Sequence, residues 1–199
     1  MGIAERKTRH KEELRSSILT AAWDMVLSEG WQSLSIRKIA DAIEYSIPVI
    51  YNHFENKEAI LLEFSKEGYQ MLACKLEQAR ATVPTPEEQL KVMADAYWDF
   101  SFEHKEYYQL MFGLGIPACE MVNQHEEIKK MTHIMISTIQ QALEVSANPG
   151  ADFFLKFHTY WSILHGLVSI QMIDKGRQPD HKGKLVLQDA MAGFCKSLV

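Results

Sequence analysis

Apolar residues recur at three- and four-residue intervals along most of the chain, which is the spacing of one helix face. Caps, glycines and prolines divide this pattern into nine expected helices. Six longer helices are expected at 11–29, 57–80, 86–104, 119–147, 152–174 and 182–198, and three shorter ones begin at Ile36, Ile47 and Lys105. No pair of alternating segments indicates a β-hairpin. We therefore expect an all-α fold.

The composition and the positions of helix-breaking residues support this interpretation and suggest two domains. A chain of 199 residues that is 47% hydrophobic, with six prolines and ten glycines, can bury a sizeable core and favours helices. We expect one domain at 1–57 and a second at 58–199. Breaks are expected at Gly30, before the capping box of Thr85 and Glu88, and at 113–117 and 148–150. The Gly-x-Gly at 113–115 has no strand before it, so it predicts a turn rather than a nucleotide site.

Residues 33–62 predict two short helices joined by a tight turn and followed at once by a third. Ser33 or Ser35 can cap the first helix, Ser46 can cap the second, which has Pro48 in its first turn, and Asn56 can cap the long helix that follows. The second helix is too short to bury much of itself. Its apolar residues should hold it to the body, while polar residues at its end face outward as hydrogen-bond donors suited to phosphates and base edges. The inward set is Val49, Ile50 and Phe54, and the outward set is Tyr51, Asn52, His53 and Lys57. This is the architecture of a helix-turn-helix DNA reader.

The same residues resemble the signature of the TetR family of transcriptional regulators, roughly (T/S)-x-R-x-I-A-x-x-A-G-V-S-x-x-x-(L/I)-Y-x-H-F-x-x-K-x-x-L-L. The matching positions are Ile39-Ala40, Ser46, Tyr51-Asn52-His53-Phe54, Asn56-Lys57-Glu58 and Leu61-Leu62. The turn position that the family fills with glycine is Glu44 here, which raises the cost of any positive φ. The resemblance implies a homodimeric regulator of double-stranded operator DNA, with phosphate contacts from Tyr51, His53 and Lys57. The full set of expected DNA-binding residues is Ser35, Arg37, Ser46, Ile47, Pro48, Val49, Tyr51, Asn52, His53 and Lys57, of which Ile47, Val49 and Asn52 are the candidates for base readout.

The net charge of −5 is unevenly distributed. Residues 1–57 hold eight Lys/Arg and eight Asp/Glu, so the whole excess of acid lies in 58–199. Near the N-terminus, a basic arm is expected ahead of the first helix, formed by Arg6, Lys7, Arg9, His10 and Lys11. Such an arm can follow phosphates or enter a minor groove. The alternative is a solvated, frayed terminus.

A second resemblance lies on the helix at 152–174. Trp161, His165 and Gly166, together with the segment 107–112, resemble the Trp-x-x-x-His-Gly pattern of one C-terminal domain subtype in the family. This resemblance implies a ligand-sensing and dimerising domain. The helix carries apolar residues on two sides, so its own domain should cover one side and a partner subunit the other. The inner side holds Phe154, Phe157, His158, Trp161, His165, Val168 and Met172, and the expected dimer interface is Phe153, Tyr160, Ile163, Leu167, Ile170, Met191 and Phe194.

Aromatic and methionine side chains suggest a candidate effector site in the second domain. The expected lining is Tyr97, Phe100, Tyr108, Met111, Met131, Met135, Phe157, Trp161 and His165. Since this set contains no Arg or Lys, an uncharged or weakly anionic aromatic or acyl compound would suit it. The alternative is that these residues are simply core, with His165 bonded to a backbone carbonyl or to the hydroxyl of Ser162 or Ser169. His158 and His165 could share a metal by spacing, but no third ligand supports them, so no metal or other cofactor is expected.

The remaining features narrow the functional class. Cys74, Cys119 and Cys195 are widely spaced, and the sequence has neither a secretory signal nor a membrane-spanning run, which together predict a cytoplasmic protein. Two hypotheses are compatible with a helical chain: a repressor released by a small apolar or aromatic effector, and an all-helical enzyme or carrier. Because no catalytic motif accompanies the helices, we favour the regulator over the enzyme.

Overall fold

The computed structural model describes residues 2–112, 126–146, 150–173 and 181–198. Within these ranges the chain forms nine α-helices and one 3₁₀ turn, so the all-α prediction is confirmed. The elements are α1 (Ile3–Glu29), η1 (Trp31–Ser33), α2 (Ile36–Ala42), α3 (Ile47–Tyr51), α4 (Lys57–Arg80), α5 (Pro86–Glu103), α6 (Lys105–Phe112), α8 (Glu126–Val145), α9 (Phe153–Ile173) and α10 (His181–Lys196). The turn expected at 113–117, Cys119 and the break at 148–149 lie outside the described residues.

Three helix starts form by the predicted capping contacts. The Ser35 hydroxyl accepts a hydrogen bond from the Lys38 N–H at 3.1 Å, and Asn56 Oδ1 accepts one from the Ala59 N–H at 2.8 Å. Thr85 accepts from the Glu88 N–H at 3.3 Å and donates to the Glu88 carboxylate at 2.7 Å. Ser46 stands at the predicted N-cap position of α3, but its side chain makes no capping hydrogen bond. Each capping side chain satisfies a backbone group that the helix itself leaves without a partner.

The turn between α2 and α3 has the conformation that its sequence makes costly. Glu44 has φ of 59°, and it is the only non-glycine residue with positive φ in the described part of the chain. The left-handed region costs an L-residue about 1–2 kcal/mol. The Tyr45 N–H donates to the Ala40 carbonyl at 3.0 Å across this turn, so a hydrogen bond partly offsets the cost.

The N-terminal segment corrects one prediction. Helix α1 begins at Ile3 rather than near residue 11, so the basic residues are part of the helix and do not form an arm ahead of it. The Glu5 carboxylate accepts a hydrogen bond from the Gly2 N–H at 2.8 Å and closes the first turn. Hydrophobic periodicity gave no sign of these turns because their side chains face solvent.

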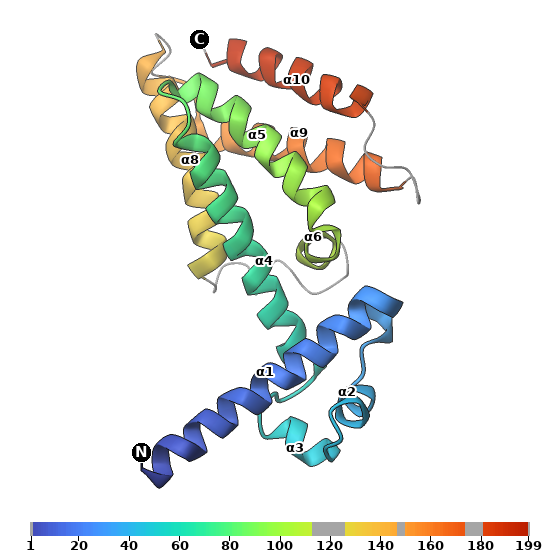
Figure 1. The fold of residues 1–199 in the computed structure, drawn as a ribbon. Coiled ribbons are helices and arrows are strands. Elements are labelled where there is room, and N and C mark those ends of the chain that lie inside the picture. The colour runs from blue at the N-terminus through green and yellow to red at the C-terminus, as the bar shows by residue number, and fades with distance from the viewer. Residues whose placement is uncertain (1, 113–125, 147–149, 174–180, 199) are drawn as a thin grey trace.

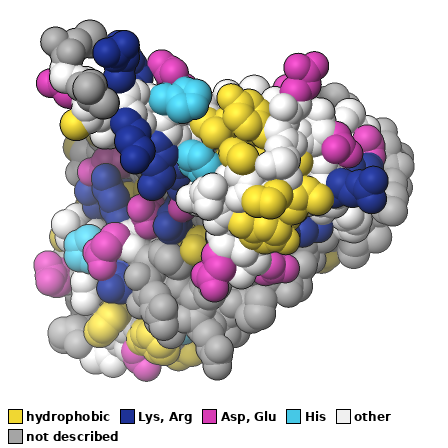
Figure 2. All heavy atoms as spheres, turned by 90° about the horizontal axis from the view of Figure 1, so that it is seen from below, with side chains coloured by type: hydrophobic (Ala, Val, Ile, Leu, Met, Phe, Trp, Pro, Cys, Tyr) yellow, Lys and Arg dark blue, Asp and Glu magenta, His cyan; other side chains and the backbone are white. Residues whose placement is uncertain are grey.

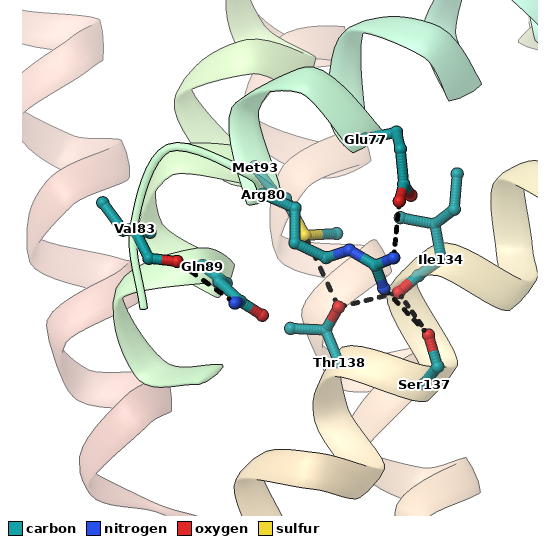
Figure 3. Close-up of polar contacts among 8 residues, drawn as sticks. All are labelled: Glu77, Arg80, Val83, Gln89, Met93, Ile134, Ser137 and Thr138. Atoms are coloured by element: carbon teal, nitrogen blue, oxygen red, sulfur yellow. Dashed lines mark hydrogen bonds and ion pairs between the residues drawn. The ribbon is translucent and has the colours of Figure 1, made fainter. Parts of the chain in front are cut away.

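Helix α4 connects the two parts of the molecule (Figure 1). Its N-terminal end lies beside α1–α3, and its C-terminal half runs against α5 and α8. Arg80, in the last turn of α4, donates to Ser137 at 3.2 Å and pairs with Glu77 at 2.7 Å (Figure 3). The neighbouring Thr138 hydroxyl donates to the Ile134 carbonyl at 2.8 Å. The far end of α4 is therefore attached to α8, while its near end carries the DNA reader.

The C-terminal core lies between α4, α5, α8 and α9. Leu72, Met93, Tyr97, Met131 and Met135 each have 0% of their surface exposed. None of the described helices combines the length and the apolar character needed to cross a membrane.

Candidate DNA interface and effector core

The α2–α3 turn and α3 place most of the predicted DNA-binding residues on one surface. Ile47 and Tyr51 are 39% and 51% exposed, although both are large and apolar in part, while Ile50 of the same helix is fully buried. Exposed members of the predicted set are Arg37, Ser46, Ile47, Pro48, Tyr51 and Asn52, and half-buried members are Ser35, Val49, His53 and Lys57. The structure thus brings the predicted set together at α2, α3 and the start of α4.

His53 is less outward than predicted. It is half-buried, and its Nδ1 atom has no hydrogen-bond partner among the described residues. Burial lowers the pKa of His53, and the positive charges of Lys11 and Arg15, with His10, lower it further. These three side chains come from α1, so α1 contributes charge at the end of the recognition helix.

Arg15 of α1 contacts Phe54, just after α3, and Glu63 of α4. Its guanidinium lies 4.6 Å from the centre of the Phe54 ring and forms an ion pair with Glu63 at 2.8 Å. Burial acts to raise the pKa of Glu63, but hydrogen bonds from Arg15 and Lys66 outweigh it and lower that pKa. The face of the molecule seen from below carries a run of Lys and Arg side chains beside histidine and exposed apolar side chains (Figure 2). Such a face can bind phosphates and contact base edges.

In the second domain, α6 and α9 meet through a hydrogen bond between two side chains. The Tyr108 hydroxyl lies 2.7 Å from His165 Nδ1, and the Tyr97 hydroxyl lies 3.4 Å from that of Tyr108. Burial raises the pKa of Tyr108 to about 12 and lowers the pKa of His165, so both groups are neutral near pH 7. We assign Tyr108 as donor to Nδ1, which places the His165 proton on Nε2. The histidine partner is therefore a tyrosine, and not the carbonyl or serine hydroxyl considered from the sequence.

Aromatic rings surround this pair. The Phe112 ring centre lies 5.0 Å from that of His165 and 6.3 Å from that of Trp161, and Phe157 lies 5.5 Å from Trp161. Phe112 was not among the expected effector-lining residues, although its position four residues after Tyr108 puts both on one face of α6. We call the six residues Tyr97, Tyr108, Phe112, Phe157, Trp161 and His165 the aromatic cluster.

Trp161 supplies a polar group that its surroundings do not satisfy. Its Nε1 atom is buried and has no hydrogen-bond partner among the described residues. Burial raises the pKa of Tyr97 well above its usual value, and the Trp161 indole acts on that pKa in the opposite direction, although it forms no hydrogen bond with the Tyr97 hydroxyl. A buried N–H without an acceptor costs about 1–3 kcal/mol, which a bound acceptor could offset.

The other predicted effector residues lie elsewhere in the core. Phe100 packs on His104 at 5.1 Å and borders a groove of about 600 Å³ between α4 and α5, rather than the aromatic cluster. Met111 packs against Gly68 of α4, where a Cβ atom would come within 2.6 Å of the Met111 sulfur. Met131 and Met135 are fully buried on α8. The predicted convergence of all nine residues is therefore only partly realised.

Three residues of the predicted dimer interface are covered by their own subunit. Tyr160 is fully buried, its hydroxyl donates to the Leu90 carbonyl at 2.8 Å, and its ring lies 5.3 Å from that of Phe194. Met191 and Phe194 are 2% and 4% exposed. The buried side of α9 is the stripe Phe157, Tyr160, Leu164 and Val168, which packs on α5, α8 and α10.

The outer side of α9 keeps the remaining four predicted residues. Phe153 and Ile170 are 41% and 64% exposed, and Ile163 and Leu167 are half-buried. Phe154 and His158, which were assigned to the inner side, are also exposed. On α10, Leu185 and Val186 are exposed as well and were not predicted. No group of three His, Cys, Asp or Glu side chains suited to a metal ion occurs among the described residues.

A short helix presented on a three-helix reader and joined by α4 to a helical core defines a DNA-binding transcriptional regulator. Residues 18–64 match the family described as bacterial regulatory proteins, tetR family, and residues 90–188 match the tetracyclin repressor-like C-terminal domain. The chain belongs to the TetR family of helix-turn-helix transcriptional regulators, which are not enzymes.

Individual relatives agree with this assignment. The chain is 28% identical over 102 residues to the HTH-type transcriptional activator FasR of Mycolicibacterium smegmatis, covering 51% of this chain and 47% of FasR, about half the length of that relative. A protein of unknown function from Rhodococcus sp. RHA1 superposes with a TM-score of 0.75 at 20% identity, covering 92% of this chain and 94% of that one. The regulator FadR from Bacillus subtilis, solved with stearoyl-CoA, gives a TM-score of 0.68 at 17% identity, covering 92% and 97%. At these identities the two structures show the fold alone.

Proposed function

We propose that this regulator is a homodimeric repressor that releases its operator when a small apolar, aromatic or acyl compound binds at the aromatic cluster. In this proposal residues 1–57 read DNA, and residues 58–199 bind the effector and dimerise. We also propose that the C-terminal domain is of the Trp-x-x-x-His-Gly subtype, from Trp161, His165 and Gly166.

The effector proposal rests on three polar side-chain groups at the centre of the otherwise apolar aromatic cluster. Tyr108 and His165 form a hydrogen bond of 2.7 Å, and the Trp161 N–H beside them has no acceptor among the described residues. Binding sites for small molecules commonly combine an apolar wall with a few polar groups that orient the guest. A carbonyl or carboxyl oxygen of a guest would provide an acceptor for the Trp161 N–H.

The relatives favour an acyl compound over other apolar guests. FadR of Bacillus subtilis was solved with stearoyl-CoA, whose acyl chain is apolar. FasR, by contrast, bears the name of an activator, so a ligand that strengthens DNA binding is the specific alternative to release.

A route from the aromatic cluster to the DNA reader runs through α6. Tyr108 belongs to the cluster, while its neighbour Tyr107 packs on Trp23 of α1 with ring centres 4.3 Å apart. The carbonyl of Glu106 accepts a hydrogen bond from Trp31 at 2.9 Å. A guest that displaces Tyr108 would move α6 and, with it, these contacts. An effector can act only if it binds the two arrangements with different affinity.

The dimer proposal rests on the apolar residues that α9 and α10 leave uncovered. Phe153, Ile163, Leu167 and Ile170 of α9 are exposed or half-buried, and Leu185 and Val186 of α10 are exposed. A symmetric interface would bury these side chains against their equivalents and would present two readers to the two halves of an operator.

The test uses the full chain and a duplex that it selects from a random library. Stearate, stearoyl-CoA and free CoA are added while DNA affinity and melting temperature are followed. We expect the acyl compounds to raise the melting temperature and weaken DNA binding, and free CoA to do neither.

Two variants locate the site. Trp161→Ala should abolish both responses, whereas Trp98→Phe, a change in an aromatic residue of α5 that packs on Phe102 at 5.0 Å, should preserve them. Stronger DNA binding with ligand would contradict release. No response to any acyl or aromatic compound would mean that the cluster is only core.

A further inference from the structure

The first turns of α1 extend beyond the packed body of the DNA reader. Residues 4–13 are all exposed, and Leu14 is the first buried residue after them. In Figure 1 this end of α1 projects away from α2 and α3. The segment is helical without packing, with Glu5 at its start and an ion pair between Arg9 and Glu13 at 4.0 Å.

Charges on this extension are separated by helix face. Lys7 and Lys11 continue the stripe that Leu14 and Ile18 form further along α1, because residues spaced by three and four share a face. At about 100° per residue, His10 lies beside this stripe, whereas Arg6 lies closer to Glu13 than to the stripe. Glu5, Glu12 and Glu13 fall on the opposite side, together with Arg9. The same face of α1 is therefore apolar where the helix packs against the rest of the domain, and basic in its exposed first turns.

The basic face is continuous with the recognition helix. His10, Lys11 and Arg15 all act on the His53 imidazole at the end of α3, so these α1 side chains lie near it. Viewed from below, Lys and Arg side chains form one run beside the histidines and the exposed apolar side chains (Figure 2). One surface thus includes α3 and the extension of α1.

We propose that the α1 extension is a second DNA-binding element: a helical basic face, centred on Lys7 and Lys11, that binds backbone phosphates beside the groove read by α3. The occupant follows from charge complementarity, because a row of cations next to a DNA-reading helix faces the same polyanion. Since phosphate contacts carry no base identity, the element adds affinity and footprint length rather than sequence preference.

The experiment compares two single variants that each remove one positive charge, from opposite faces of the extension. Lys7→Gln removes a cation from the basic face, and Arg9→Gln removes one from the face that carries Glu13. Each is titrated with the selected duplex in two lengths, trimmed to the reader's site and extended by about ten base pairs at each end. Circular dichroism verifies that both variants keep their helix content.

We expect wild type to bind the longer duplex several-fold more tightly than the trimmed one. Lys7→Gln should lose much of this gain and lower the salt slope by about 0.9 for each phosphate contact removed. Arg9→Gln should keep the gain, and the double change of Lys7→Gln with Lys11→Gln should abolish it.

Three outcomes would overturn the proposal. Equal losses in Lys7→Gln and Arg9→Gln would mean that only net charge matters. Equal affinity of wild type for the two duplexes would mean that the extension does not touch DNA. Lys7-dependent binding to vesicles of anionic phospholipid, without any effect of duplex length, would assign the face to a membrane surface instead.

Discussion

The indole N–H of Trp31 donates a hydrogen bond to the main-chain carbonyl of Glu106 at 2.9 Å, joining residues 75 apart in the sequence. Trp31 belongs to the DNA reader, and Glu106 lies in the first turn of α6. The Trp23 ring, 5.8 Å from Trp31, packs on the adjacent Tyr107. Two neighbouring residues of α6 are therefore attached to the reader, independently of its covalent connection through α4.

Replacing Trp31 by Phe should test this attachment. The substitution keeps a ring in the cluster but leaves the Glu106 carbonyl without its donor, at a cost of about 1–2 kcal/mol. Urea unfolding should show the loss. Leu27→Ala, at a site of α1 that is 57% exposed, serves as the control and should change stability much less. An unaltered unfolding midpoint in Trp31→Phe would mean that water replaces the tryptophan at no cost.

The turn at Glu44 gives a stability prediction of opposite sign. Glu44→Gly removes the penalty of positive φ and should stabilise the protein by about 0.5–1 kcal/mol, after allowance for the greater freedom of glycine in the unfolded chain. Glu55→Gly removes the same charge from the same domain at a position without positive φ, so it should not stabilise. Thermal melting of both variants distinguishes backbone strain from charge.

Features that depend on local chemistry were predictable from the sequence, and those that depend on which surfaces meet were not. The caps of Ser35, Asn56 and Thr85 and the costly turn at Glu44 each involve neighbouring residues. The partner of His165 is 57 residues away. Its identity depends on how α6 packs on α9, which no local pattern encodes.

Helix α9 shows that the sequence also does not reveal which face of a helix is buried. It is apolar on both sides, so periodicity indicates that both need cover without telling which side the chain itself covers. The structure buries Tyr160 and exposes Phe154, the reverse of the expected assignment. The N-terminal turns of α1 were missed for the opposite reason: their side chains are polar and exposed, so no apolar stripe marks them.

Substitutions at the recognition helix should separate affinity from sequence preference. Lys57→Ala should weaken binding to all duplexes and lower the salt slope by about one, because Lys57 is expected to contact a phosphate. Asn52→Ala should instead change the preference at one base pair by roughly 1–3 kcal/mol. Fluorescence titrations against the selected duplex and its single-base variants measure both. A uniform loss in Asn52→Ala would place that side chain on the backbone.

Stability should fall in mild acid because of His165. Burial lowers its pKa below the ordinary 6.5, so the unfolded chain binds the proton more readily than the folded one. Unfolding free energy therefore rises with pH in this range: the contribution is fully present above about pH 6.5 and is lost as pH falls through the lower, folded pKa. His53 has a pKa shifted in the same direction and should contribute similarly.

The two histidines can be separated by variants. His165→Gln should flatten part of the dependence of stability on pH below about pH 6.5, and His53→Gln should remove another part. Because bound phosphate would favour protonated His53, only His53→Gln should also flatten the pH dependence of DNA binding. An unchanged pH profile of unfolding in His165→Gln would contradict a buried, neutral imidazole at that position.

Dimerisation should depend on the outer side of α9. Leu167 is half-buried there and lies between Ile163 and Ile170, so a partner's α9 crossing near Leu167 would bring the two equivalent side chains close to the symmetry axis. Leu167→Glu would place two carboxylates near each other in an apolar contact, which is costly unless the subunits separate. Sedimentation at micromolar concentration should then give a monomer, while Leu27→Glu, in the N-terminal domain, should stay dimeric.

The affinity of Leu167→Glu for a two-half-site operator should fall more than its affinity for a single half-site, because only the former requires both DNA-binding domains at once. If Leu167→Glu sediments as a dimer, the subunits associate through another surface, and the exposed Leu185 and Val186 of α10 become the next positions to change.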